Sequence, residues 1–168
     1  QGSDRPVESV NWHEAQEFIQ KLKGETDLPF QLPTEAQWEF AARGGRNSPY
    51  KYAGSNKLTE VGWFTENSHR ETKSVGLKAP NELGIYDRSG NVWEWCVDEY
   101  DVKAYSKLPQ VNPASLPQVG FDRVLRGGCE IESASDVRAS SRFGSAERIR
   151  FSIFGFRVVR TSKVKTKP

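Results

Sequence analysis

The 168-residue sequence predicts an α+β domain, with two helices near its start and short strands joined by long loops in the remainder. Two segments before residue 45 have helix caps and a single apolar face. Short apolar clusters follow, separated by Gly, Pro, Asn and Ser. The composition places five Trp and nine Phe beside 14 Gly and nine Pro, which favours irregular backbone packed around large side chains.

The first helix is expected over residues 12–23. Asn11 is placed to cap it, and Glu14 stands at the reciprocal position of a capping box. Apolar residues then recur at helical spacing along one face. Gly24 is expected to end the helix, because glycine readily adopts the left-handed conformation found after helix ends.

The second helix is expected over residues 34–43. Thr34 and Gln37 form a second capping box, and Gly44 with Gly45 stops the helix. Both helices are expected to pack on a sheet through four tryptophans: Trp12, Trp38, Trp93 and Trp95.

Five apolar clusters predict the strands, at residues 61–64, 84–86, 92–96, 123–125 and 154–159. No internal repeat divides the chain, so residues 1–160 are expected to form a single domain, which at this size buries about 70% of the surface of the unfolded chain. Residues 161–168 have no apolar face and are expected to be a flexible tail.

Charge and hydropathy exclude some function classes. Lys and Arg total 24 and Asp and Glu total 22, and no basic stretch alternates with aromatic residues, so we expect no nucleic acid partner. No apolar run is long enough to span a membrane. The compartment stays open, with the cell surface or secretion as alternatives if a leader precedes the chain. Cys96 and Cys129 permit either one disulfide or two free thiols.

Five strings together resemble one family. They are Pro6–Trp12 (PVESVNW), Leu32–Gly45 (LPTEAQWEFAARGG), Asn81–Trp95 (NELGIYDRSGNVWEW), Arg126–Gly128 (RGG) and Gly155–Val158 (GFRV). Their order and spacing resemble the formylglycine-generating-enzyme, or sulfatase-modifying, domain as far as Arg160. The resemblance implies a C-type-lectin-like fold, with two helices on a small twisted antiparallel sheet and long ordered loops. That fold serves oxidases, ergothioneine enzymes, kinase-linked accessory domains and ligand-binding proteins, so it does not by itself decide function.

The oxidases of this family hold copper with a pair of cysteines after the Arg-Gly-Gly string, because Cu(I) selects soft thiolates. The corresponding stretch, residues 129–142, contains only Cys129. The histidines, His13 and His69, are not placed beside each other or beside a nucleophile. We therefore expect no copper, no catalytic residues and no enzyme activity.

A calcium site is implied by the resemblance at Asp87–Glu94. The positions matching Asp87 and Glu94 supply side-chain oxygens in the family, and those matching Gly90 and Val92 supply backbone carbonyls, a ligand set typical of calcium. The alternative interpretation is that Asp87 caps a turn and Glu94 is buried against an arginine.

The segment from residue 129 to 153 is similar to one subgroup, the variable proteins of diversity-generating retroelements. Where that subgroup has asparagine tracts in its template copy, this chain has Phe143, Gly144, Ser145, Ala146, Ile149, Phe151, Ser152 and Ile153. An asparagine codon can encode all eight after adenine replacement, and a serine codon can give Cys129, whereas Glu130 and Glu132 are not reachable from asparagine. The alternative is that Ile149, Phe151 and Ile153 form one side of a half-buried strand.

We expect a ligand-binding, receptor-like protein in which residues 129–153 form a diversified, exposed face on a conserved scaffold. The partner is an unidentified protein or other macromolecule. Besides the eight residues above, the face includes Cys129, Glu130, Ile131, Glu132, Ser133, Ser135 and Asp136. Arg138, Arg142 and Arg157 are expected beneath it. The alternative function is a formylglycine-generating-like enzyme, or an accessory domain of an enzyme or kinase.

Overall fold

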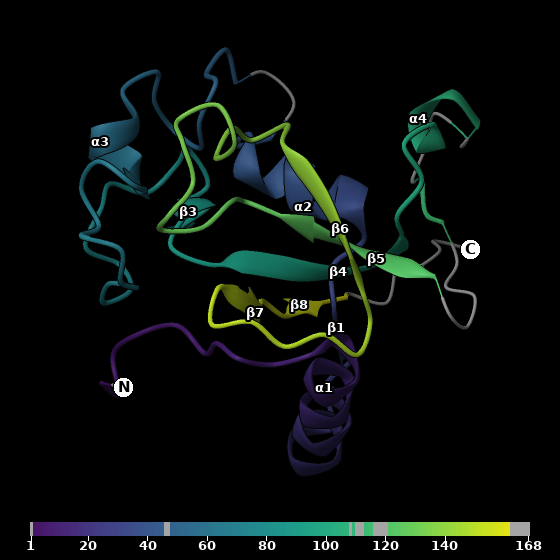
Figure 1. Cartoon of the computed structure of the whole chain (residues 1–168). Helices are drawn as coiled ribbons and strands as arrows, with labels where there is room; N and C mark the ends of the chain where they lie inside the picture. Colours follow the sequence, from purple (N-terminus) through teal and green to yellow (C-terminus); the bar gives the residue numbers. More distant parts are fainter. Residues whose placement is uncertain (1, 46–47, 108, 110–112, 116–120, 162–168) are drawn as a thin grey trace, which may run out of the picture.

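The computed structural model describes residues 2–45, 48–107, 109, 113–115 and 121–161. Its helices are α1 (Trp12–Thr26), α2 (Glu35–Ala42), α3 (Leu58–Val61) and α4 (Ala104–Lys107). Its strands are β1 (Phe30–Gln31), β2 (Gly62–Trp63), β3 (Ser89–Gly90), β4 (Trp93–Glu99), β5 (Asp122–Arg126), β6 (Arg142–Ala146), β7 (Phe154–Phe156) and β8 (Val159–Arg160). The predicted α+β class is confirmed, with α1 and α2 on opposite sides of the central strands (Figure 1).

The central sheet has four strands in the order β6-β5-β4-β7. Strands β6, β5 and β4 are antiparallel, as expected, but β7 runs parallel to β4. The sheet is therefore mixed, because residues 147–153 cross from one edge of the sheet to the other before β7 begins. Two short ladders, antiparallel β1-β8 and parallel β2-β3, tie the outer loops to this sheet.

Helix α1 begins where its capping box predicts. The side chain of Asn11 accepts from the backbone N–H of Glu14, and the Glu14 carboxylate accepts from the N–H of Asn11. The helix passes the predicted stop at Gly24 and ends at Thr26. Asp27 takes the left-handed conformation there, with φ 54°, and its N–H donates to the carbonyl of Lys23. A short polar side chain tolerates that conformation, so the helix does not need a glycine at its end.

Helix α2 confirms the second capping box, in which Thr34 and Gln37 satisfy each other's backbone N–H groups. Trp38 is fully buried in a core cluster with Ala42, Cys96 and Val124. Its indole N–H donates to Glu94, which binds the helix to β4 through a buried polar contact as well as through apolar packing.

The main core cluster lies between α1 and the sheet and includes Ile19, Trp93, Trp95, Leu125 and Phe154. Of the four tryptophans expected in the interior, Trp38, Trp93 and Trp95 are buried, whereas Trp12 is half-buried against the cluster.

Several local differences separate this fold from the sequence prediction. Residues 84–86 form no strand, Val61 ends a short helix, and residues 154–159 divide into β7 and β8. The short elements α3, α4, β1 and β3 and the strand β6 were not expected. Thr161 still belongs to the fold, because its N–H donates to the carbonyl of Pro29. The rest of the expected tail, residues 162–168, lies outside the described residues.

Candidate functional site

One arginine organises the long loop that precedes β6. Arg126, at the end of β5, is completely buried. Its guanidinium donates to the carbonyls of Ala139, Ser140 and Ser141 at 2.8–3.1 Å and is neutralised by Glu35 and Glu39. Buried carbonyls need such donors, because unpaired polar groups are costly in the interior. The end of the loop is therefore held from inside the molecule.

The start of the same loop depends on close backbone packing. Gly128 has φ 75°, and a Cβ atom there would lie 2.5 Å from Cγ1 of Val137 and 2.9 Å from its Cα. Only glycine fits this approach. Val137 itself is fully buried, so residues 129–136 connect two fixed points.

The apolar side chains expected on the face are largely exposed. Exposed fractions are 39% for Ile131, 44% for Phe143, 39% for Ile149 and 55% for Phe151. Ser133, Ser135, Asp136, Ala146 and Ser152 are exposed as well, while Glu132, Gly144 and Ile153 are half-buried. Exposed large apolar side chains are typical of interaction sites where they lie together on the surface.

Three residues assigned to the face are buried, so that part of the prediction is wrong. Cys129 is fully buried in the main core cluster. Glu130 is 5% exposed, because its backbone is bonded to Asn91 and Ser68 beneath the loop. Ser145 is 9% exposed and pairs with Arg123 of β5. These positions form the support of the face.

The two exposed phenylalanines are fixed by a series of aromatic contacts. Phe143 packs on Trp93 with ring centroids 5.5 Å apart and on Phe154 at 6.3 Å. Phe151 meets the same Phe154 edge-on at 5.2 Å. The half-buried-strand alternative for residues 149–153 is wrong, because no strand forms there: residues 149–151 are irregular and residues 152–153 lie in a turn. Two exposed rings thus share one buried ring as their support.

A polar cavity of about 550 Å³ adjoins Phe143. Glu132, Asp136 and Arg138 line it together with Trp93. The indole N–H of Trp93 points to Glu132 at 3.4 Å, and Asp136 accepts from the hydroxyl of Ser133 at 2.5 Å. The face therefore combines apolar rings with a charged hollow.

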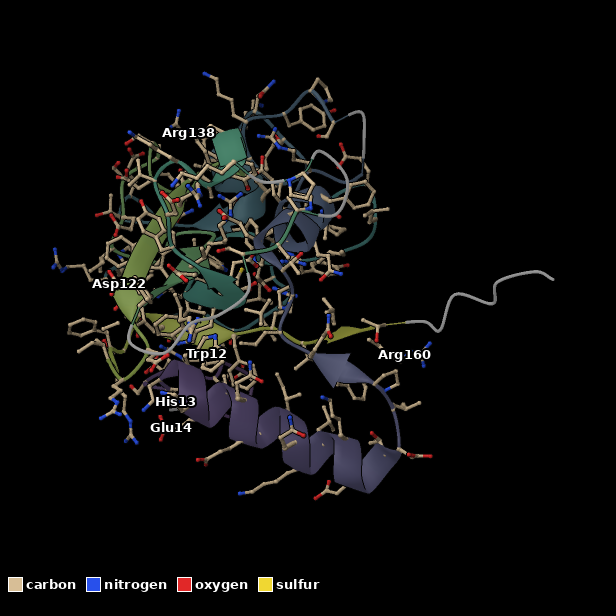
Figure 2. The ribbon with its side chains drawn as sticks, turned by 90° about the vertical axis from the view of Figure 1, so that its right-hand side faces the viewer. Trp12, His13, Glu14, Asp122, Arg138 and Arg160 are labelled. Atoms are coloured by element: carbon tan, nitrogen blue, oxygen red, sulfur yellow. The ribbon has the colours of Figure 1, made fainter. Side chains whose placement is uncertain are left out.

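The three arginines expected beneath the face behave differently. Arg142 binds Glu35 through two contacts of 2.5 and 2.8 Å and also donates to the carbonyl of Asp101, so it fixes the start of β6 without bonding the backbone of the face. Arg138 is exposed, although its Nε donates to the carbonyl of Ser135. Figure 2 shows it on the surface, at one end of the face. Arg157 lies away from the face and binds Glu94.

Arg126 was the functional support that sequence reasoning missed. Arg126 stands in the Arg-Gly-Gly string, but the string does not show which carbonyls its guanidinium binds. A long ordered loop needs hydrogen-bond donors for its buried carbonyls, and this requirement could have pointed to a buried arginine.

The cysteines do not form a pair. Both are free and buried, and they lie in different core clusters. Burial raises the pKa of Cys129 to about 12 and raises that of Cys96 well above its usual value. These protonated, separated thiols do not fit a Cu(I) thiolate pair. Within the described residues, no group of three His, Cys, Asp or Glu side chains could hold a metal ion.

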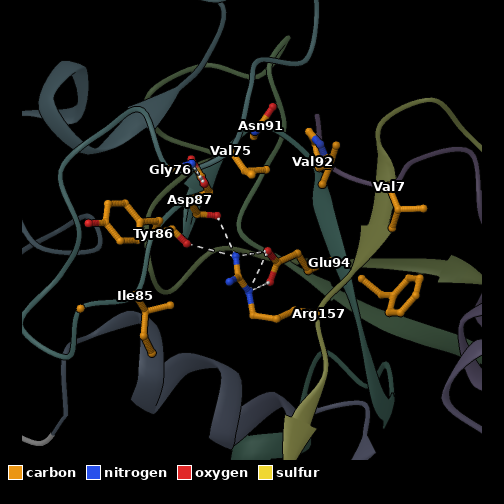
Figure 3. Close-up of a pocket in the computed structure, with 13 residues that line it drawn as sticks. Val7, Val75, Gly76, Ile85, Tyr86, Asp87, Asn91, Val92, Glu94 and Arg157 are labelled. Atoms are coloured by element: carbon orange, nitrogen blue, oxygen red, sulfur yellow. Dashed lines mark hydrogen bonds and ion pairs between the residues drawn. The ribbon is translucent and has the colours of Figure 1, made fainter. Parts of the chain in front are cut away.

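Glu94 is buried against two arginines. Its carboxylate contacts Arg157 at 2.8 Å, as Figure 3 shows. It also contacts Arg88 at 3.4 Å and accepts from Trp38 at 2.6 Å. Burial alone would raise the pKa of Glu94, but Arg157 and Arg88 outweigh it and hold the pKa below its usual value. The charge of this carboxylate is therefore balanced within the chain.

Asp87 has one engaged and one free oxygen. Oδ2 accepts from the N–H of Gly76 at 2.7 Å, while Oδ1 is buried without a hydrogen-bond partner. Asp87, Val92 and Glu94 line a cavity of about 500 Å³. The fit to calcium is partial: the free oxygen of Asp87 suits it, but Glu94 is occupied by arginines. The interpretation with a capped turn and an arginine-paired Glu94 matches these contacts.

Comparisons with known proteins agree with this architecture. A family model described as the sulfatase-modifying factor enzyme 1-like domain matches residues 1–162. The formylglycine-generating enzyme of Streptomyces coelicolor is 33% identical over 171 residues, covering 92% of this chain and 52% of that protein. The serine/threonine-protein kinase pkn1 of Chlamydia pneumoniae is 35% identical, covering 90% of this chain and 23% of that protein. The chain thus spans about half or less of these curated relatives.

Solved structures show the same fold. Treponema denticola variable protein 1 superposes with a TM-score of 0.83 at 33% identity, covering 94% of this chain and 72% of that one. PvdO from Pseudomonas aeruginosa superposes with a TM-score of 0.85 at 26% identity, covering 95% of this chain and 63% of that one. The fold is therefore C-type-lectin-like, of the formylglycine-generating type. The chain belongs to the sulfatase-modifying factor family.

No helix in the described part of the chain is long and apolar enough to cross a membrane.

Proposed function

We propose that this chain is a ligand-binding domain, in which the exposed residues of segment 131–153 form a diversified binding face. The partner is a protein or another macromolecule. The observation that carries the proposal is the contrast between exposed residues of that segment and the buried residues in and beside it that hold the loop. Ile131, Phe143, Ile149 and Phe151 reach solvent, whereas the residues that hold the loop, such as Arg126 and Val137, are fully buried.

The physical basis is that only exposed positions tolerate replacement. Substituting a buried large side chain commonly costs about 2–5 kcal/mol, which is much of a domain's stability. Exposed rings supported by a buried one can change without opening a cavity. They also supply the aromatic anchors that dominate many interfaces. The likeness to a solved variable protein supports the same proposal.

Sequencing of the gene and its surroundings tests the diversification. We expect a reverse transcriptase gene beside a near-copy of the stretch encoding residues 126–157. Within a cell population, substitutions should concentrate at adenines in codons for exposed face residues and should spare those for Arg126 and Val137. A locus with neither a near-copy nor such variation would contradict the proposal.

A second candidate is an enzyme related to the formylglycine-generating relatives, because 92% of the chain aligns with one of them. We expect no such activity, since the two cysteines are buried apart from each other. Incubated with copper, oxygen and a cysteine-containing sulfatase peptide, the protein should give no formylglycine by mass spectrometry. Turnover that disappears in Cys129→Ala would favour the enzyme over the binding domain.

We further propose that calcium binds at Asp87, with the carbonyls of Gly90 and Val92 and with Glu94 once Arg157 withdraws. The support is the buried Oδ1 of Asp87, which has no protein partner. Calcium should raise the melting temperature of the parent, because it binds the folded state, and should not raise that of Asp87→Asn. If both proteins respond equally to calcium and to chelator, calcium does not bind at Asp87. The loop is then held by the hydrogen bond of Asp87 and the pairing of Glu94 with arginines alone.

A further inference from the structure

Strand β6 lies at one edge of the central sheet. All five of its residues, Arg142–Ala146, pair in continuous register with β5, from Arg126 to Asp122. Among the described residues, no strand pairs with its other side. Figure 2 shows this strand along the margin of the molecule, between Arg138 and Asp122. Its outer backbone groups therefore border the proposed binding face.

Strand β6 has no lysine, proline or bulge, and no described strand covers its outer edge. Exposed edges are commonly blunted by lysine, proline, a bulge or a covering element. The sequence of β6 is Arg-Phe-Gly-Ser-Ala, and its register has no shift. Gly144, at its centre, lies on the ring of Tyr100, where a Cβ atom would come within 2.5 Å of the ring. Gly144 thus packs closely on Tyr100, and no described strand pairs with the outer edge of β6.

We propose that β6 accepts an extended segment of the protein partner as an additional strand of the sheet. This inference rests on the proposed binding function and names how its partner is held. Backbone hydrogen bonds supply affinity in such strand addition, and side-chain contacts supply specificity. A mode of binding that depends on backbone groups stays available whichever side chains the face carries.

Charge indicates the chemistry of that segment. Most arginines near the face are paired: Arg142 with Glu35, Arg150 with Glu14 and Arg123 with Glu147. Arg138 and Arg148 are exposed, and neither forms an ion pair with any described residue. They lie before and after β6 in the chain. A bound segment should therefore carry acidic residues at its ends and an apolar side chain toward Phe143.

A second copy of this chain is a poorer occupant of the edge. Antiparallel pairing of two β6 strands about Gly144 would bring Arg138 of each copy toward the turn containing Arg148 of the other. Like charges brought together in this way weaken association. The acidic extended segment of another protein satisfies the same groups.

The test uses three synthetic peptides and the full chain. The first is acetyl-Glu-Val-Thr-Val-Thr-Val-Glu-amide, the second has lysine at both ends, and the third is the first with alternate backbone nitrogens methylated. Amide NMR should show the first peptide shifting and protecting residues 142–146. The lysine peptide should bind at least tenfold more weakly, and the methylated peptide should not bind. In the variant Arg138→Glu with Arg148→Glu, the preference should reverse.

Equal binding of all three peptides, shifts confined to other strands, or no shift up to the solubility of the peptides would overturn the inference. Protection of residues 142–146 that depends on protein concentration without peptide would overturn it in favour of a second copy. The proposed function is tested separately by the variation at the gene. If the gene is diversified but β6 binds no peptide, strand addition is rejected and the proposed binding function is not.

Discussion

At the scale of single residues, the boundary between face and support falls between neighbours in the chain. Ile131 is exposed, whereas Glu130 beside it is buried, and one of its carboxylate oxygens has no hydrogen-bond partner. Burial raises the pKa of Glu130 above its usual value, and the nearby charges of Glu8 and Glu132 add to the effect. Folding therefore disfavours the charged form of this side chain relative to the unfolded chain.

The substitution Glu130→Gln should stabilise the protein at neutral pH. An acid whose pKa is raised on folding destabilises the fold once pH exceeds the folded pKa, and has no such effect below the unfolded pKa. We expect Glu130→Gln to unfold at a higher urea concentration than the parent at pH 7, because the raised pKa of Glu130 reflects a buried carboxylate that folding disfavours. The gain in stability should vanish near pH 3.5, where Glu130 is largely protonated in both the folded and the unfolded protein.

Urea unfolding at both pH values measures the effect, with Glu132→Gln as the matched control. Glu132 is half-buried and contacts the indole of Trp93, so its substitution should change stability little at either pH. A loss of stability in Glu130→Gln at neutral pH would mean that a cationic partner stabilises the carboxylate, which would contradict the prediction.

At the scale of elements, the sequence predicted what depends on local chemistry. The capping boxes of α1 and α2 were readable because both partners stand three residues apart, and both were confirmed. Strand β6 was not readable. Gly144 and Ser145 have little strand propensity, and the strand forms because β5 pairs with it from distant sequence. Likewise, the buried state of Cys129 follows from tertiary packing against Trp93 and Leu125.

The ring contacts of β6 and the following turn give a stability prediction. The double change Phe143→Ser with Phe151→Ser removes side chains that are about half exposed, so it should cost about 2 kcal/mol in total. The single change Phe154→Ser removes the buried ring between them and should cost more, about 3–5 kcal/mol. Ile153 is left unchanged because it packs against the main core.

Guanidinium chloride unfolding of the three proteins measures this order. If the double variant is as unstable as Phe154→Ser, the two exposed rings belong to the core and cannot be diversified positions.

At the scale of the whole molecule, the resemblance predicted the fold, which is confirmed, but it did not predict the buried contacts that support the proposed binding segment. The family strings identify the positions of the scaffold without showing their contacts. The three carbonyls bound by Arg126 and the pairing of Glu94 with Arg157 depend on segments that only the folded chain brings together. The scaffold is thus a network of buried arginines and carboxylates, and the face lies outside it.

The most direct test of the division between a variable face and a fixed scaffold compares two libraries on the cell surface. One randomises Ile131, Phe143, Ile149 and Phe151, and the other randomises four buried residues of similar kind, Leu125, Val137, Val124 and Phe154. Protease resistance of each clone measures folding. We expect most clones of the first library to fold and few of the second to do so. Equal losses of folded clones in the two libraries would contradict that division.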